Sequence, residues 1–220
     1  MIIDMSDFTR KSLESLTRAL PASYYDEIFE SSQKYLDPAK DSPYKVVWDK
    51  VLEKLPPKCS ILDIGCGPGQ FATLCIKAKH LYVGADFSEV AIKRGRKIVP
   101  KATFHLVDII KDKSLLTKGD YDVVTLIEFL EHVEEDLGVL SSIPEGKKVV
   151  LTVPKYWSDS HVRVFKTPIN AHIRYGKFID IESLDTITFG ETWDRRPEPR
   201  GHFVRDQWVI YVLSGTRRDK

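Results

Sequence analysis

The stretch 60–71 constrains the fold more than any other part of the chain. In it a short apolar run ends in an acid and then breaks into three alternating glycines, Ser-Ile-Leu-Asp-Ile-Gly-Cys-Gly-Pro-Gly-Gln-Phe. This order predicts a buried parallel strand, a tight turn and the start of a helix. Glycine suits such a turn because it reaches positive φ and because a backbone without a Cβ lets a ligand come close. We therefore expect a ligand to bind at this turn.

The glycine spacing and the acid ahead of it separate two kinds of nucleotide ligand. A dinucleotide fingerprint has its third glycine three residues after the second, where this chain has Gln70. Asp63, two residues ahead of the first glycine, would repel a pyrophosphate but attract a ligand that carries an ammonium and a sulfonium. These features favour S-adenosylmethionine over NAD, and they argue against a nucleotide-linked oxidoreductase.

The pattern Asp63-x-Gly65-x-Gly67-x-Gly69 resembles motif I of the class I S-adenosylmethionine-dependent methyltransferases, and segments between about residues 43 and 165 fit that family in order. The resemblance implies a Rossmann-like α/β fold: a mostly parallel seven-stranded sheet with helices on both faces and an N-terminal helical lid. The expected cofactor-binding residues are Asp63, Gly65, Cys66, Gly67, Gly69, Asp86, Phe87, Asp108, Ile109 and Glu128.

Length and composition fit one α/β domain with additions. The 220 residues suffice for a proper core, and 42% hydrophobic and 30% charged residues are ordinary values. The formal net charge of +1 gives no overall attraction to nucleic acid or to an anionic membrane. Three cysteines without a C-x-x-C pair, and the absence of a leader or a long apolar run, predict a cytoplasmic protein that does not associate with membranes.

We expect three parts along the chain. They are a helical lid segment (1–42), a methyltransferase domain that binds S-adenosylmethionine (43–215) and a tail (216–220). In the lid, apolar spacing predicts helices over 6–20 and 23–36. Tyr24, Tyr25 and Tyr35 either touch the methionine part of the cofactor or only pack the lid onto the core.

Five apolar runs alternate with helical segments and predict a parallel sheet. The runs are 60–64, 81–85, 102–107, 121–127 and 146–153, and two more strands (179–189 and 203–213) are expected to add an antiparallel hairpin around the loop 191–202. In open α/β sheets, ligands bind at the carboxyl ends of the strands. Asp86, at the end of the second run, is a candidate to accept hydrogen bonds from both ribose hydroxyls. The alternative is that it caps the helix that follows. The resemblance implies that Asp108 contacts the adenine amino group and that Ile109 packs on the adenine ring. The alternative is that Asp108 is an acidic loop residue without a ligand.

The fourth run leads directly into Glu128-Phe129-Leu130-Glu131-His132, a second acidic cluster. If this segment is helical, Glu128, Glu131 and His132 share a face. Two carboxylates and an imidazole suit Mg²⁺ or Mn²⁺, with His161 as the candidate fourth ligand and His172 in reserve. An oxygen acceptor must lose its proton to a base or at a metal ion. His132 and His161 therefore have three open roles: metal ligand, catalytic proton acceptor or structural residue.

The E-x-x-E-H pattern followed by a later histidine resembles two metal-using groups of the family. These are the 2′-O-methyltransferases that modify the 3′ end of small RNAs and the ubiquinone-biosynthesis O-methyltransferases. We expect methyl transfer to an oxygen or nitrogen of a small molecule, because the near-zero net charge argues against RNA. The alternatives are a metal-dependent RNA 3′-terminal 2′-O-methyltransferase and a non-catalytic regulatory subunit that binds S-adenosylmethionine.

Overall fold

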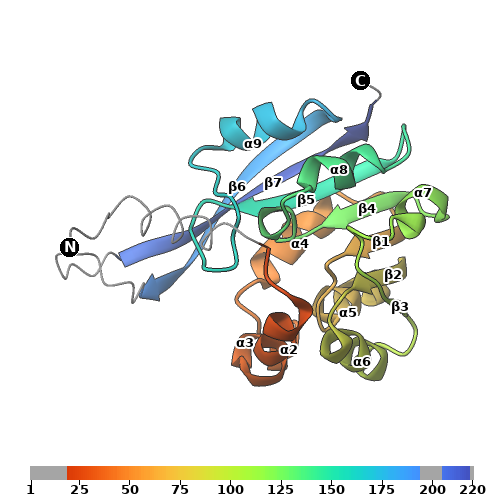
Figure 1. Ribbon diagram of the computed structural model, residues 1–220, viewed down its shortest axis with the longest axis vertical. Helices are drawn as coiled ribbons and strands as arrows, with labels where there is room; N and C mark the ends of the chain where they lie inside the picture. The colour runs from red at the N-terminus through yellow and green to blue at the C-terminus, as the bar shows by residue number, and fades with distance from the viewer. Residues whose placement is uncertain (1–18, 194–204, 219–220) are drawn as a thin grey trace, which may run out of the picture.

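A seven-stranded sheet forms the centre of the computed structural model, which describes residues 19–193 and 205–218 (Figure 1). The strands are β1 (Ser60–Ile64), β2 (Leu81–Asp86), β3 (Thr103–Leu106), β4 (Val123–Leu126), β5 (Lys148–Pro154), β6 (Ile179–Trp193) and β7 (Arg205–Arg217). Their order is β3-β2-β1-β4-β5-β7-β6. The first five strands pair in parallel, and β7 is antiparallel to both β5 and β6. The predicted fold class is therefore confirmed.

Helices cover both faces of the sheet. They are α2 (Ala22–Ser31), α3 (Gln33–Leu36), α4 (Lys45–Glu53), α5 (Gln70–Lys77), α6 (Glu89–Ile98), α7 (Ser114–Lys118), α8 (Asp136–Ser141) and α9 (Pro168–Tyr175), with a 3₁₀ turn η1 (Leu130–His132). One apolar core joins the sheet to α7, α8 and α9, and the other joins it to α4, α5 and α6.

The strands read as continuous apolar runs because the sheet is buried on both faces. Successive side chains alternate between the two cores: Ile61 and Val123 belong to the core on the α4–α6 side, whereas Leu62 and Val124 belong to the core on the α7–α9 side. All four side chains are at most 2% exposed. This packing fixes the strand ends from which the candidate site is built.

The lid differs from its prediction in its continuity. The backbone of Ser32 is extended (φ −82°, ψ 119°), so α2 and α3 are separate helices where one helix was expected over 23–36. The helix expected over 6–20 lies outside the described residues apart from Ala19 and Leu20, which are not helical. Figure 1 shows α2 and α3 on the same side of the molecule as α5 and α6.

The C-terminal hairpin is longer than its prediction. β6 continues to Trp193, and the rest of the loop expected over 191–202 lies outside the described residues. Thr216 and Arg217, expected in a tail, belong to β7. Nε of the buried Arg217 guanidinium donates a hydrogen bond to the carbonyl of Leu140 at 3.0 Å, which holds the end of β7 against α8.

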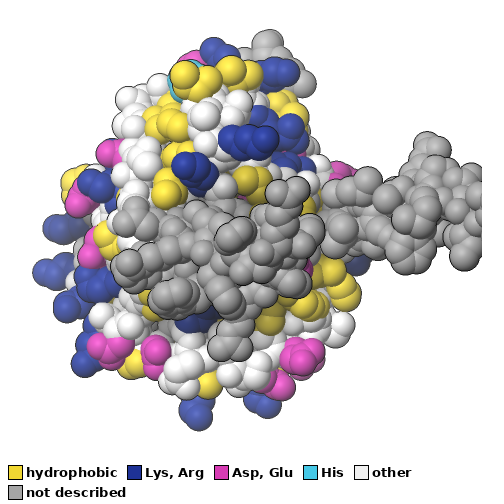
Figure 2. All heavy atoms as spheres, turned by 90° about the vertical axis from the view of Figure 1, so that its left-hand side faces the viewer, with side chains coloured by type: hydrophobic (Ala, Val, Ile, Leu, Met, Phe, Trp, Pro, Cys, Tyr) yellow, Lys and Arg dark blue, Asp and Glu magenta, His cyan; other side chains and the backbone are white. Residues whose placement is uncertain are grey.

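The surface carries both signs of charge. In the view of Figure 2, Lys and Arg side chains share the visible surface with acidic and apolar side chains. Among the described residues, no helix has the length and apolar character needed to span a bilayer.

Candidate functional site

A cavity of about 1150 Å³ opens at the carboxyl ends of β1, β2 and β4, beneath the lid. The predicted site residues that line it are Asp63, Gly65, Cys66, Gly67, Asp86, Phe87, Asp108, Ile109, Glu128, His132 and His161. Gly69 and Glu131 are not among its lining residues. The structure thus brings most of the predicted cofactor-binding residues to one pocket.

The glycine turn requires glycine at its first position for two reasons. Gly65 has φ of +74°, and a Cβ there would lie 2.6 Å from Cδ2 of Phe129. The turn is tied to the next strand, because the Gly67 N–H donates to Oδ2 of Asp86 at 2.9 Å. The glycine turn therefore lines the pocket and is held to the end of β2.

Asp86 is held at the end of β2 by backbone donors. Its Oδ1 accepts from the Ser88 N–H at 2.9 Å, and its Oδ2 accepts from the Gly67 N–H. Burial raises the pKa of the Asp86 carboxyl to about 6. The helix cap of α6 is Ser88, whose Oγ accepts from the Ala91 N–H at 3.0 Å. Asp86 is thus oriented toward the pocket, and its ribose role stays a prediction.

Asp63 is buried at the end of β1 and already has a partner for each oxygen. The Tyr82 hydroxyl donates to its Oδ2, and the Thr125 hydroxyl donates to its Oδ1 at 2.6 Å. Burial raises the pKa of the Asp63 carboxyl to about 7, against the lowering effect of the two hydrogen bonds. Asp63 therefore braces β1 against β2 and β4, which fixes the strand end from which the glycine turn begins.

Asp108 and Ile109, the residues predicted to contact adenine, follow β3 and line the pocket. Asp108 Oδ1 accepts from the Ile110 N–H at 3.1 Å, and its Oδ2 pairs with Lys111 Nζ at 2.8 Å. Ile109 is buried in the core on the α7–α9 side. The ring of Phe87 lies 5.3 Å from the ring of Tyr25 in the lid. The roles predicted for these residues are compatible with their positions and stay predictions.

The lid contacts the glycine turn and α6 directly. A Cβ on Gly67 would lie 3.6 Å from the ring of Phe29. Asp26 Oδ1 accepts from the Ser88 hydroxyl at 2.5 Å. Tyr25 lies 5.9 Å from His132, measured between ring centroids. Tyr24, Tyr25 and Tyr35 all line the pocket, so their rings both pack the lid and face the cavity.

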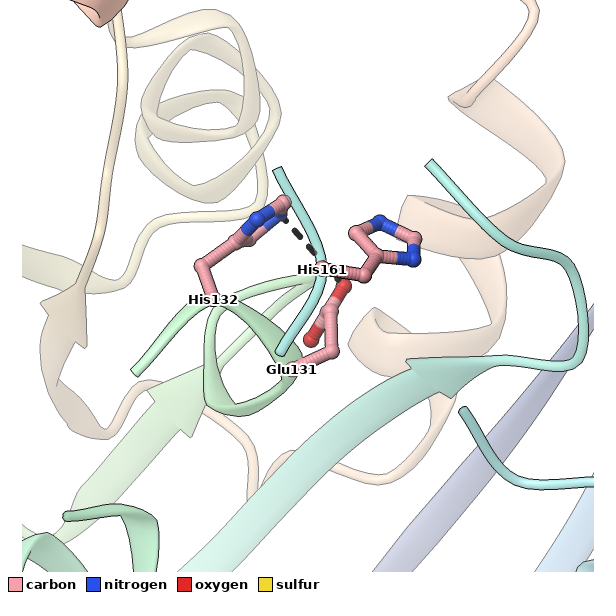
Figure 3. Close-up of side chains that lie close together, drawn as sticks. All are labelled: Glu131, His132 and His161. Carbon is pink, nitrogen blue, oxygen red and sulfur yellow. Dashed lines mark ion pairs between the residues drawn. The ribbon is translucent and has the colours of Figure 1, made fainter. Parts of the chain in front are cut away.

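Glu131, His132 and His161 form a compact group at the pocket (Figure 3). One ligand atom from each residue lies within 4.8 Å of the others. Glu131 is fully buried, and neither of its carboxylate oxygens has a hydrogen-bond partner among the described residues. Burial raises the pKa of this carboxyl well above its usual value, and the neighbouring Glu128 adds to the shift.

Backbone carbonyls set the tautomer of both histidines. Nδ1 of His132 lies 2.9 Å from the carbonyl oxygen of Ser160, and Nδ1 of His161 lies 3.2 Å from that of Tyr156. A carbonyl only accepts, so each Nδ1 carries the proton and each Nε2 keeps its lone pair. Burial lowers the pKa of His132 to about 4 and that of His161 to about 3. Both rings are therefore neutral near pH 7.

Arg163, which the sequence reasoning did not select, joins the two segments that carry this group. Its guanidinium donates to the carbonyls of Leu130, Val133 (2.5 Å) and Glu134 (3.0 Å) around η1. The Val162 N–H donates to the Glu131 carbonyl at 2.8 Å, which pairs the His161 segment with η1 directly. Figure 3 shows Glu131 and His132 on one segment and His161 on the other.

Residues 128–132 do not form the helix that a shared face for Glu128, Glu131 and His132 would require. Only residues 130–132 turn, as 3₁₀, and Glu128 has a positive φ of 50°. Glu128 Oε1 accepts from Thr152 at 2.8 Å and Oε2 from Tyr156 at 3.2 Å, so Glu128 is not part of the Glu131 group. Burial raises the pKa of the Glu128 carboxyl to about 7. His172 is exposed on α9 and also lies outside the group.

The glycine turn after β1, the acid at the end of β2 and the antiparallel β7 beside β5 define a class I methyltransferase fold. Residues 39–188 match the family model described as a methyltransferase domain, and the chain belongs to this family.

Two curated relatives are named methyltransferases, and a solved structure shares the fold. The chain is 27% identical over 113 residues to a ubiquinone biosynthesis O-methyltransferase of Hydrogenovibrio crunogenus (50% of this chain, 46% of the relative). It is 35% identical over 85 residues to the enzyme of that name from Vibrio campbellii (37% and 36%). These alignments span about half or less of each relative's length. A TehB-like SAM-dependent methyltransferase from Corynebacterium glutamicum shares the fold, with a TM-score of 0.59, 18% identity and coverage of 90% and 100%.

Proposed function

We propose that the chain is an S-adenosylmethionine-dependent methyltransferase whose acceptor is a small molecule with two adjacent oxygen atoms, bound through a divalent metal ion. The observation that carries this proposal is the fully buried Glu131 carboxylate, which has no hydrogen-bond partner among the described residues and faces two imidazoles. A buried carboxylate without a partner is costly unless a ligand compensates it.

The residues fit Mg²⁺ or Mn²⁺. Glu131 offers carboxylate oxygens, and His132 and His161 offer Nε2 lone pairs while their Nδ1–H groups are held by backbone carbonyls. Such an arrangement of outer hydrogen bonds is typical of metal-ligating histidines. When bound, the ion would orient the acceptor oxygens and lower the pKa of the hydroxyl to be methylated. Glu128, the further ligand that the sequence suggested, is not included in this set because Thr152 and Tyr156 occupy its carboxylate oxygens.

The histidines are poorly suited to act as bases instead. A general base works best when its pKa lies near the working pH, and burial holds the pKa values of His132 and His161 at about 4 and 3. Their neutral rings are, however, in the state that metal ligation requires. The ligand role is therefore favoured over proton acceptance for both residues.

The remaining pocket residues align the reactants. In methyl transfer the protein mainly positions donor and acceptor and excludes water. The glycine turn and Asp86 would hold the cofactor, and the rings of Tyr25 and Phe87, whose centroids lie 5.3 Å apart, line the same pocket. The two curated relatives are named O-methyltransferases, which supports an oxygen acceptor.

The proposal is tested by calorimetric titration of Mn²⁺ into protein saturated with S-adenosylhomocysteine. Wild type should bind Mn²⁺, and Glu131→Gln should weaken that binding by more than about 100-fold while leaving S-adenosylhomocysteine affinity unchanged. The matched control is Glu135→Gln, because the Glu135 side chain is 63% exposed. Failure of wild type to bind Mn²⁺ would overturn the metal site, and failure to bind S-adenosylhomocysteine would overturn the whole proposal.

The acceptor is then identified by transfer of a radiolabelled methyl group. We expect labelling of catechol, which presents adjacent oxygens, in preference to an RNA oligonucleotide with a 3′-terminal diol. Labelling of the RNA alone would establish the RNA 3′-terminal 2′-O-methyltransferase alternative. Binding of S-adenosylhomocysteine without transfer to either acceptor would favour the regulatory-subunit alternative.

A further inference from the structure

Lys34, on the short lid helix α3, is a cation inside the pocket that the proposed function leaves without a role. Among the described residues that line the cavity, the lysines are Lys34 and Lys111, and no arginine is present. Lys111 is 83% exposed at its side chain and pairs with Asp108. Among the described residues no carboxylate oxygen lies within 4.0 Å of Lys34 Nζ, so its charge is available to a ligand.

Two aromatic rings lie close to the ammonium. Lys34 Nζ lies 4.7 Å from the ring centroid of Tyr35 and 5.7 Å from that of Tyr44. Ring faces stabilise a cation moderately, but they do not replace the hydrogen bonds of its three N–H donors. Burial lowers the pKa of Lys34, as expected for an ammonium that has lost water without gaining a close carboxylate.

Glu128 is the acid that acts electrostatically on Lys34, and it compensates the ammonium only in part. Both Glu128 oxygens already accept hydrogen bonds, one from Thr152 and one from Tyr156. A fully ionised ligand carboxylate would be a better partner for the ammonium.

The lid holds Lys34 at a fixed place relative to the glycine turn. Gln70, the residue that follows the last glycine, donates from Nε2 to the carbonyls of Lys34 at 3.0 Å and Asp37 at 2.6 Å. The methionine end of S-adenosylmethionine carries a carboxylate as well as an ammonium. The acids at this end of the pocket, Asp63 and Glu128, suit the positive groups of that ligand but repel its carboxylate.

We infer that Lys34 is the carboxylate-binding residue of this pocket. The inference rests on the proposed function, because it assumes that a ligand with a carboxylate enters the cavity. That carboxylate comes either from the methionine end of the cofactor or from an acidic group on an aromatic acceptor that stacks among the tyrosine rings. The chemistry recognised is the same in both cases.

Whether the carboxylate belongs to the cofactor is tested by a double-mutant cycle. One change is made in the protein, at Lys34, and the other in the ligand, by removing its carboxylate. Calorimetry gives the affinities of wild type and Lys34→Met for S-adenosylhomocysteine and for its decarboxylated analogue. Removing either the ammonium or the carboxylate should cost roughly 10- to 100-fold, and removing both should cost no more than either alone. Lys34→Arg should retain most of the affinity. The control is Lys40→Met, because the Lys40 side chain is 78% exposed.

The test for the acceptor source uses protein saturated with S-adenosylhomocysteine. Benzoate and its neutral analogue benzamide are titrated in turn, and the tryptophan fluorescence is followed. A preference for benzoate of roughly tenfold or more that disappears in Lys34→Met would place the carboxylate on the acceptor.

Additive losses in the first cycle together with no benzoate preference in the second titration would overturn the inference. That result leaves the proposed function intact as long as S-adenosylhomocysteine binds. If wild type does not bind S-adenosylhomocysteine at all, the proposed function fails instead, so the two failures are distinguishable.

Discussion

Replacing Tyr82 by Phe tests the energetic role of the buried acid at the end of β1. The variant removes one hydroxyl that donates to Asp63 and leaves the Thr125 bond in place. The Tyr82 side chain is 3% exposed and Asp63 is 2% exposed, so water does not replace the lost donor readily. The stability lost in the variant should therefore depend on whether the Asp63 carboxyl is ionised.

The expected loss depends on pH. Burial raises the pKa of Asp63 from an ordinary 3.8 to about 7, so the folded chain holds a proton that the unfolded chain has lost between these values. The free energy of unfolding of wild type accordingly falls as the pH rises through this window. At about pH 8 the variant loses a hydrogen bond to an ionised group, which is worth about 1.5–3 kcal/mol. At about pH 5.5 the carboxyl is neutral and the loss is about 1 kcal/mol.

The assay is urea-induced unfolding of wild type and variant at both pH values. The matched control is Tyr121→Phe, because Tyr121 is also 3% exposed and its hydroxyl donates to a neutral acceptor, the carbonyl of Leu116. We expect the control to lose about 1 kcal/mol at either pH. Equal losses for Tyr82→Phe at the two pH values, with the control behaving as expected, would refute the claim that the Tyr82 hydroxyl stabilises an ionised Asp63.

Three further predictions concern ligand binding, each measured by calorimetry. Gly65→Ala should weaken S-adenosylhomocysteine binding by at least about tenfold, because its φ of +74° is strained for alanine and the new Cβ meets Phe129; unchanged affinity would contradict the required geometry. Wild-type affinity for this ligand should fall as the pH drops through about 6, since Asp86 then becomes protonated; the decline should be absent in Asp86→Asn, whose affinity is low throughout. Arg163→Met should weaken Mn²⁺ binding by roughly 10- to 100-fold without changing S-adenosylhomocysteine affinity; equal weakening of both ligands would indicate general disruption instead.

The parts of the fold that the sequence predicted well are those determined locally. A run such as 60–64 is apolar on both faces, ends at glycines and continues into a helix, so its strand-turn-helix structure follows from neighbouring residues. The position of Asp86 at the end of β2 follows from the same kind of pattern. Their meeting at one pocket follows from the general rule that ligands bind at the carboxyl ends of parallel strands.

The segment that carries Glu128 could not be predicted in this way, because distant residues determine its shape. The Glu128 backbone takes a positive φ while its N–H donates to the Thr152 hydroxyl at 2.9 Å, and Thr152 lies on β5. Spacing of three and four residues indicates a shared face only if the backbone is helical, and here only 130–132 turns. The pairing of Glu131 with His161 depends likewise on Arg163 and on a backbone bond between the two segments.

Gln70 attaches the lid to the glycine turn. In a dinucleotide fingerprint, a glycine at this position permits close packing of helix and strand; here the position is taken by a side chain whose amide reaches the lid carbonyls of Lys34 and Asp37. Gln70, whose presence in place of a glycine disfavours a pyrophosphate ligand, therefore also attaches the lid to the glycine turn. Because Asp26 attaches the same lid to Ser88 beside the Asp86 carboxylate, the lid is anchored on both sides of the predicted cofactor site. A ligand that orders the glycine turn and Asp86 would consequently also fix Lys34, which links cofactor binding to the formation of the proposed carboxylate site.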